Sequence, residues 1–384
     1  MTPEIDRRRF LALSAAAAAS FAAARRAFAR AAPSPTPAGW PGYERAIVVD
    51  ALGGVGVDKE SDDAPLTASD LSDARASGVT AVNITVSSVG VLEGAFESTV
   101  RQIGFWEREL DRHPDVLTRV RSAADLRAAK SSGRLGLIYG FQDTLALGDQ
   151  PARLDTFSRL GVRVVQLTYN RRNLAGDGCL EPGNAGLSRF GRELVLRMNA
   201  LGILVDLSHC GQRTTAEGIA ASAGPVAITH SGCAALADLP RNKSDEDLRK
   251  LAEKGGVVGI YLMPFLRAKG QPMAEDVIRH LEHAVQVCGE DHVGIGTDGS
   301  ISPVAVTPEF VKRFREDIAN RRRLGISAPG ESEDVYTFVP DLNTPRRFET
   351  IAEQLLARGH SELRVEKILG ANFARLFAEV WRPA

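Results

Sequence analysis

The feature that most constrains the fold is a regular alternation of short apolar runs with helical patterns, which starts near residue 47. The runs are rich in β-branched residues and bounded by glycine, as is typical of buried parallel strands. Eight such strands with helices between them favour a single-domain, closed (β/α)8 barrel of the TIM type over an open sheet. The expected strands are residues 47–51, 79–86, 135–141, 162–168, 203–207, 226–229, 256–262 and 292–296.

Helical periodicity between and after these runs predicts the covering helices. The expected helices are residues 69–76, 97–112, 187–201, 245–253, 273–288, 312–323, 349–357 and 363–379. Residues 305–341 interrupt the alternation with a charged helix and a loop rich in Gly, Pro and Glu. We interpret this segment as an insertion after the eighth strand, at the end of the barrel where loops surround a substrate.

The composition is that of an ordinary globular protein. The chain has 384 residues, is 44% hydrophobic and 25% charged, and has a formal net charge of −1. This balance offers no basic stripe for nucleic acid and no polybasic membrane patch. The four cysteines lack the spacing of a disulfide framework or a zinc finger. Cys210 and Cys233 lie close to His209 and His230 in the sequence. Each is either a small buried thiol or has a redox or metal-binding role near these histidines.

The N-terminus has the pattern of an export signal. Three arginines at Arg7–Arg9 precede an alanine-rich apolar stretch and the sequence Ala27-Phe28-Ala29. The adjacent arginines resemble the twin-arginine type, and the apolar stretch is too short for a transmembrane anchor. We therefore expect a signal peptide over residues 1–31, a linker over 32–45, a barrel domain over 46–384, and a periplasmic or secreted protein.

Polar residues follow the expected strands and should converge at one end of the barrel. In order they are Asp50, Gln142–Asp143, Tyr169–Asn170, His209, His230 and Asp298. Neutral imidazoles are good zinc ligands, and a nearby carboxylate completes a metal shell or acts as a general base. His209 and His230 therefore predict a metal site, with Asp298 beside it.

Several ordered motifs resemble the membrane (renal-type) dipeptidases, peptidase family M19. They are Leu-Thr-Tyr-Asn170, Gly-Leu-Ser-Arg-Phe-Gly191, Leu-Val-Asp-Leu-Ser-His209, Thr-His-Ser231, Pro-Arg-Asn242, Gly-Ile-Gly-Thr-Asp298 and Leu-Gly-Ala-Asn-Phe373. The resemblance covers nearly the whole chain after the signal. It implies a metal-dependent (β/α)8 barrel, often dimeric, that hydrolyses dipeptides with two zinc ions.

The resemblance also implies roles for particular residues. His209 and His230 match the two histidines that hold the second zinc, and Asp298 matches the aspartate that handles the catalytic proton. Arg241 matches the arginine that binds the substrate carboxylate, a task suited to the guanidinium fork. Asn242, next in the same motif, is also expected to bind substrate.

The sequence departs from the family at four positions. Leu52 and Gly54 replace the first-strand histidine and aspartate that hold the first zinc. Gln142 replaces the glutamate that bridges the two ions, and a neutral amide brings no charge to offset their repulsion. Tyr169 replaces a histidine that helps to polarise the substrate carbonyl. We therefore expect one zinc ion, held by the two histidines and Gln142 or Asp298, with Tyr169 as a hydrogen-bond donor.

Three functions remain open at this stage, because a fold does not specify a reaction. The first is an exported metallohydrolase that cleaves dipeptides or similar small amides. The second is an enzyme of another class on the same scaffold, which tailors or isomerises a secreted peptide metabolite. The third is a binding protein that has lost the chemistry. The retained histidines and Asp298 argue against the third, because a pocket used only for binding does not need them.

Overall fold

The structure is a computed structural model that describes residues 39–56, 64–90, 92–323 and 325–381. The expected signal peptide and residues 32–38 of the expected linker lie outside the described residues. The chain divides into two compact units, residues 1–41 and 42–384, and all described helices and strands belong to the second. Tyr43, which we expected in the linker, is buried, and its hydroxyl donates to Ser77 O at 2.7 Å. The packed unit therefore begins before residue 46.

The strands form one parallel sheet in which neighbours in sequence are mostly neighbours in space. In the described part of the chain the order is β10-β1-β2-β4-β5-β6-β7-β8-β9, with β3 beside β4. The strands are β1 (Val49–Gly54), β2 (Ala81–Thr85), β3 (Leu117–Arg119), β4 (Leu135–Phe141), β5 (Val162–Gln166), β6 (Leu204–Asp206), β7 (Ala227–Ser231), β8 (Val257–Ile260), β9 (Val293–Ile295) and β10 (Gly299–Ser300).

The sheet closes on itself where β10 meets β1. Strands β9 and β10 are two parts of one strand position, and β10 pairs with β1 through Gly53–Gly299 and Gly54–Ser300. Between β9 and β10, the Asp298 N–H donates to Leu52 O at 2.8 Å. The last strand position is thereby joined to the first, and the expected (β/α)8 barrel is confirmed.

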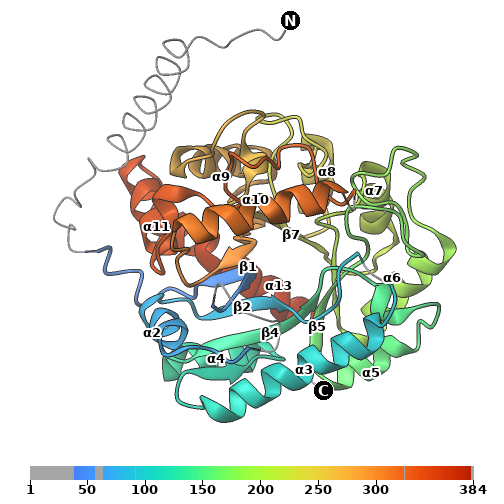
Figure 1. Ribbon diagram of the computed structural model, residues 1–384, viewed down its shortest axis with the longest axis horizontal. Helices are drawn as coiled ribbons and strands as arrows, with labels where there is room; N and C mark the ends of the chain where they lie inside the picture. The colour runs from blue at the N-terminus through green and yellow to red at the C-terminus, as the bar shows by residue number, and fades with distance from the viewer. Residues whose placement is uncertain (1–38, 57–63, 91, 324, 382–384) are drawn as a thin grey trace, which may run out of the picture. The chain divides into compact units, whose positions relative to one another are not determined.

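Helices surround this sheet, and Figure 1 shows α3, α5, α6, α8 and α11 outside the strands. The helices are α2 (Ala68–Ala76), α3 (Ala95–Arg112), α4 (Ala123–Ser132), α5 (Arg153–Arg159), α6 (Arg189–Leu201), α7 (Gln212–Ala221), α8 (Asp245–Glu253), α9 (Ala274–Cys288), α10 (Pro308–Arg323), α11 (Arg347–Ala357), α12 (Glu362–Glu366) and α13 (Asn372–Val380). Single 3₁₀ turns lie at Leu145–Leu147, Pro264–Leu266, Glu290–His292 and Pro340–Leu342. Ser122, Ser188 and Ser244 begin α4, α6 and α8, since each side chain accepts a backbone N–H of the first turn. Among the described residues, no helix combines the length and hydropathy that a membrane-spanning segment needs.

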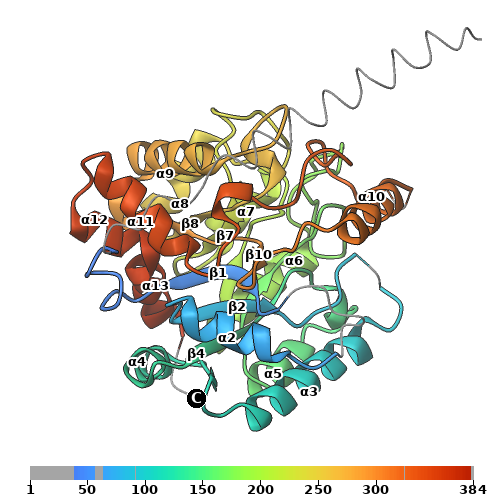
Figure 2. The ribbon, with the colours of Figure 1, turned by 60° about the vertical axis from the view of Figure 1, so that its left-hand side comes forward.

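Helix α13 covers one end of the barrel. Its side chains Phe373, Leu376 and Phe377, with Trp381, pack in one core cluster with residues near the start of the strands. The strand residues in that cluster are Val49, Ala51, Ala81, Ile138, Val164, Leu204, Ala227 and Val257. Figure 2 shows α13 and α10 on opposite sides of the strands. The carboxyl ends of the strands, where barrel enzymes place their chemistry, are therefore the end that α13 leaves uncovered.

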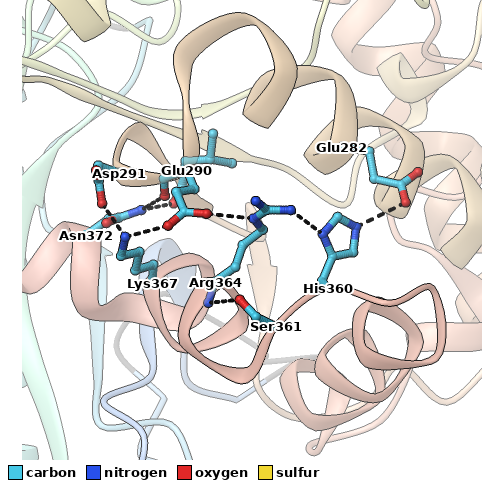
Figure 3. Close-up of polar contacts among 9 residues, drawn as sticks. Glu282, Glu290, Asp291, His360, Ser361, Arg364, Lys367 and Asn372 are labelled. Carbon is cyan, nitrogen blue, oxygen red and sulfur yellow. Dashed lines mark hydrogen bonds and ion pairs between the residues drawn. The ribbon is translucent and has the colours of Figure 1, made fainter.

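Polar contacts attach the C-terminal segment to the start of β9 (Figure 3). Arg364 and Lys367 form ion pairs with Glu290 at 2.8 and 2.7 Å. The buried Asn372 amide donates to the carbonyls of Glu290 and Val293, both at 2.8 Å. The ion pairs are partly exposed to solvent and contribute little stability, so the two Asn372 bonds hold this segment more firmly.

The expectation of one helix over 363–379 is wrong. The structure has α12, a π-helical turn η5 (Lys367–Ala371) and then α13. A Cβ on Gly370 would lie 2.5 Å from Ile47 O and 2.6 Å from Val49 N. The segment therefore approaches the start of β1 closely enough to need glycine, and the helix is interrupted there. Helices α4, α5 and α7 lie outside the helical ranges expected from the sequence.

The insertion contains α10, which includes the helix expected over 312–323. Phe310 and Phe314 of this helix stack at 5.9 Å, and Tyr336 lies 5.6 Å from Phe314. These ring contacts attach α10 to the later part of the insertion, which contains Tyr336.

Candidate active site

Polar side chains gather at the carboxyl ends of the strands. Gln142 directly follows β4, Tyr169 follows β5, and His209 follows β6. His230 lies within β7, and Asp298 lies between β9 and β10. Gln142 and His209 each contact His230, and the Tyr169 ring stacks on His209. Asp298 lies close enough for Gln142 and Arg241 to lower its pKa. The structure therefore brings together the residues that the strand-end pattern predicted.

His209 and His230 form the centre of this group. Their Nε2 atoms lie 2.9 Å apart, and both residues are buried, at 3% and 0% exposure. Burial, followed by the charge of Arg241, lowers the pKa of both imidazoles well below 6.5. Both rings are therefore neutral near pH 7, which is the state that binds a metal.

Asn170 sets the protonation of the His209 ring. Asn170 Nδ2 donates to Ile326 O at 3.2 Å, and a carbonyl oxygen only accepts. Asn170 Oδ1 therefore faces His209 Nδ1 at 2.7 Å and accepts its N–H. In the neutral ring, His209 Nε2 then carries a lone pair.

Thr229 and Asp206 act on His230 in the same way. Thr229 Oγ1 donates to Asp206 Oδ2 at 2.7 Å and lies 2.9 Å from His230 Nδ1. When Asp206 is ionised, Thr229 Oγ1 accepts from His230 Nδ1–H, and the lone pair of His230 Nε2 points toward that of His209. Two lone pairs at 2.9 Å repel each other unless a cation or a proton lies between them. This donor set fits a metal ion, with hydrogen bonds that orient each ligand.

Few other side chains are placed to complete the coordination of such an ion. In the described part of the chain, no three His, Cys, Asp or Glu side chains have the arrangement of a metal site. Gln142 Nε2 lies 3.3 Å from His230 Nε2. Its Oε1 accepts from Thr85 Oγ1 at 2.9 Å. The Gln142 amide thus presents nitrogen to His230 and has to turn over to offer its oxygen to a metal.

Asp298 has an unusual backbone and an altered acidity. Its φ is +54°, in the left-handed region that side chains rarely adopt. Burial raises the pKa of the Asp298 carboxyl to about 6, although Arg241 and Arg321 act in the opposite direction. A partly buried carboxyl group with a strained backbone, at the wall of a cavity, is typical of a functional site.

Arg241 is a buried cation without an anionic partner. The residue is 1% exposed, and its guanidinium donates to Ser208 O at 2.8 Å. It also lies over the Tyr261 ring at 5.6 Å. Asp298 acts on the pKa of Arg241 through its charge, but no ion pair joins Arg241 to an acidic residue within the described ranges. Since a buried charge is costly without a counter-charge, the geometry suits an anionic ligand group.

Tyr169 lies against His209. Its ring stacks on that of His209, with centroids 4.2 Å apart. Arg321 of α10 pairs with the buried carboxylate of Glu331 at 2.9 Å. Burial raises the pKa of Tyr169, and the charge of Arg321 lowers it. We did not foresee Arg321, because it is one of many charges on the insertion helix.

Asn242, the other residue expected to bind substrate, is fully engaged within the fold. Its Nδ2 donates to Ala237 O and Phe265 O at 2.7 and 2.8 Å, and its Oδ1 accepts from Tyr261. Contact with substrate stays a prediction, and these bonds do not favour it. They give Asn242 the role of holding the loop that carries Arg241.

Two nearby carboxyl groups do not replace the missing ligands. Asp50 accepts from Thr297 N at 2.8 Å and from Thr297 Oγ1, and burial raises its pKa to about 7. Asp143 accepts from Asn173 at 2.8 Å, and burial raises its pKa to about 6. Both are held by neighbouring strands and loops. At Gly54 an added Cβ meets nothing within 4 Å, so the space of the absent ligand is open.

Two cavities adjoin the group. One, of about 480 Å³, is lined by Asp298 and by Phe310 and Phe314 of the insertion. The other, of about 550 Å³, is lined by Tyr169 and Asn170. Each is large enough for a small-molecule ligand.

Comparison with known proteins gives a consistent result. The family model for membrane dipeptidase (peptidase family M19) matches residues 52–320. A dipeptidase of Clonostachys rogersoniana is 28% identical over 76% of this chain and 68% of its own length. A dipeptidase of Claviceps purpurea is 29% identical over 76% of this chain and 62% of its own length, so the chain spans less than two thirds of that relative.

Among solved structures, an amidohydrolase from Pseudomonas aeruginosa superposes with a TM-score of 0.74 at 36% identity. That match covers 88% of this chain and 98% of the other. A metallopeptidase from Rhodobacter sphaeroides, liganded with a phosphinate mimic of L-Ala-D-Ala, has a TM-score of 0.70 at 20% identity. It covers 88% of this chain and 100% of the other, and at that identity the likeness shows the fold alone.

Proposed function

The chain belongs to the membrane dipeptidase family, peptidase family M19, and on that premise we propose that it hydrolyses dipeptides or similar small amides with a reduced, one-metal site. The family is one of metal-dependent hydrolases, and the relatives named above include dipeptidases and an amidohydrolase. Their names support the reaction class for this chain.

The observation that carries the proposal is the facing pair of Nε2 atoms on His209 and His230, 2.9 Å apart. Their outer nitrogens are bonded to Asn170 and Thr229, which directs both lone pairs to one point. A zinc ion there would be held by the two imidazoles and by Gln142 or solvent. Zinc supplies activation of water and polarisation of a carbonyl. Leucine and glycine at positions 52 and 54 offer no ligand for a second ion.

The other residues of the site have complementary tasks in this proposal. Arg241 binds the substrate carboxylate, because it is a buried guanidinium without an ion pair. Asp298, with its pKa near 6, accepts a proton from the attacking water on a carboxylate oxygen and returns it to the leaving amine. Tyr169 donates its hydroxyl hydrogen to the oxygen that develops negative charge.

We also propose that the protein is exported by its twin-arginine-type signal to the periplasm or beyond, and that it forms homodimers. Export in a folded state suits an enzyme that acquires its metal in the cytoplasm. Gel filtration with light scattering of the mature chain tests the dimer, and cell fractionation tests the export.

Hydrolysis of a panel of dipeptides, with zinc and with a chelator, tests the activity. We expect turnover that needs metal and that is lost in His209→Ala and His230→Ala. An Arg322→Gln variant serves as a control, because Arg322 lies on the exposed part of α10 and pairs with Glu333 at 3.4 Å. Absence of turnover under every metal condition would falsify the hydrolase proposal and favour an altered reaction on this scaffold.

A further inference from the structure

Arg347, the first residue of α11, lines the cavity of about 480 Å³ that Asp298 also lines. The residue is 7% exposed. Its Nε donates to Thr344 O at 2.9 Å, and its Nη2 donates to Ile301 O at 3.1 Å. These two carbonyls fix the guanidinium but do not balance its charge. A guanidinium has five N–H donors, so Arg347 keeps donors for a ligand.

The acidic group that acts on Arg347 from the protein core is committed elsewhere. Asp50 affects the pKa of Arg347 through its charge, but no ion pair joins Arg347 to an acidic residue in the parts of the chain that the structure describes. The Asp50 carboxylate accepts instead from Thr297 N at 2.8 Å and from Thr297 Oγ1 at 2.6 Å. A buried cation without a counter-charge is costly. The first turn of a helix is also the end where the helix dipole disfavours a cation.

The other charges of the cavity do not neutralise Arg347. Arg313 and Asp317 lie one turn apart on α10, and both are exposed and opposite in charge. Asp298 shares the cavity, but Arg241 is the cation that acts most strongly on its pKa. The cavity therefore holds a buried positive charge that the fold leaves uncompensated.

The guanidinium of Arg347 lies beside the strand position that carries Asp298. A Cβ added to Gly299, the residue directly after Asp298, would lie 3.7 Å from Arg347 Nη1. Within the described ranges, Nη1 makes no hydrogen bond to the protein. Its N–H groups are thus available in the same cavity as the proposed proton acceptor.

The insertion gives this cavity an aromatic wall. The rings of Phe310 and Phe314 lie 5.9 Å apart, those of Phe310 and Phe338 lie 6.4 Å apart, and all three residues line the cavity. Apolar walls lower the local dielectric constant and strengthen the attraction between a guanidinium and an anion. The serine hydroxyls of the cavity already donate within the fold, Ser300 to Gly56 O and Ser302 to Asp70 Oδ1.

We propose that Arg347 forms a subsite for a second anionic group of the substrate, so that the protein prefers dipeptides with an aspartate or glutamate side chain. Arg241 binds the C-terminal carboxylate, and the Arg347 guanidinium binds the side-chain carboxylate. A cavity of this volume accommodates such a side chain. The inference rests on the proposed function and names the substrate class of the same site.

Paired dipeptides that differ only in charge test the subsite. The values of kcat/KM are measured for Ala-Glu against Ala-Gln and for Glu-Ala against Gln-Ala, and calorimetry gives the Kd of each dipeptide. The variants are Arg347→Met and the conservative Arg347→Lys, with thermal unfolding measured for each. Gly299→Ala keeps Arg347 and both of its bonds but places a methyl group beside Nη1, so it stays informative if Arg347→Met unfolds. Arg346→Gln is the matched control, because Arg346 pairs with Glu44 at 2.8 Å and does not line the cavity.

We expect wild type to prefer the glutamate dipeptide over its glutamine partner by about 10- to 100-fold in at least one order, as for a hydrogen bond between charged groups. Arg347→Met should abolish this preference, Arg347→Lys should keep part of it, Gly299→Ala should reduce it, and Arg346→Gln should leave it unchanged. Equal values for the charged and neutral partners in both orders would overturn the inference, as would a preference that survives in Arg347→Met. If wild type hydrolyses no dipeptide, the proposed function fails, and the Kd values still decide whether Arg347 binds the side-chain carboxylate.

Discussion

Replacement of Arg241 by methionine should separate binding from stability. Arg241 is 1% exposed, has no ion pair with a described acidic residue, and donates to Ser208 O at 2.8 Å and to His230 O at 3.5 Å. In Arg241→Met the protein loses these bonds but no longer buries an unpaired charge. The two effects oppose each other, so we expect the free energy of unfolding to stay within about 1 kcal/mol of the wild type.

Binding should respond much more strongly than stability. A hydrogen bond between charged groups contributes about 1.5–3 kcal/mol, which corresponds to about 10- to 150-fold in affinity. The assay compares KM and inhibitor Kd for a dipeptide with a free carboxylate and for the same dipeptide as its C-terminal amide. Wild type should prefer the carboxylate by this factor, and Arg241→Met should lose the preference.

A second buried arginine provides the matched control. Arg163 is 6% exposed, lies at the start of β5, and donates to Arg121 O at 2.8 Å and to Ser158 O and Val162 O at 2.9 Å. Arg163→Met should lower stability without altering the preference for the carboxylate, because it lies at the end of the barrel that α13 covers. The reasoning is refuted if Arg241→Met weakens the carboxylate and amide ligands equally.

Three further perturbations have defined outcomes. Asp50 has a folded-state pKa of about 7, above its ordinary 3.8, so the folded protein holds a proton that the unfolded chain releases. Urea unfolding should show wild-type stability falling by up to about 1.4 kcal/mol per pH unit from pH 4 to 7 relative to Asp50→Asn, and equal slopes would contradict this. Asn170→Ala removes the acceptor of an imidazole N–H and should weaken zinc binding by about 10- to 100-fold in chelator competition; an unchanged affinity would exclude that role. The triple change Leu52→His, Gly54→Asp and Gln142→Glu should raise the zinc content by one ion per chain, and no rise would mean that these ligands are not what limits metal binding.

The barrel was predictable because each strand is a local pattern. All eight expected runs overlap a strand, and the run over 135–141 matches β4 throughout. Parallel strands in a barrel present their carboxyl ends at one side, so the meeting of His209, His230 and Asp298 followed from their positions after those runs.

The contacts that tune the site were not predictable from local pattern. The charge of Arg321 lowers the pKa of Tyr169 from a helix more than 150 positions later in the chain, and nothing in the sequence distinguishes Arg321 from the other charges of that helix. The helix is interrupted at Gly370 because this residue approaches Ile47 and Val49. The spacing of apolar residues along the helix gives no sign of that contact. Both features are set by tertiary contacts between segments far apart in sequence.

The zinc content of the protein, measured by elemental analysis after purification without chelator, tests the one-metal site most directly. We expect about one ion per chain, and none in the His209→Ala/His230→Ala double variant. Two ions per chain would mean that other residues replace the absent ligands. No bound zinc, even after zinc is offered, would contradict a metal site at the two histidines.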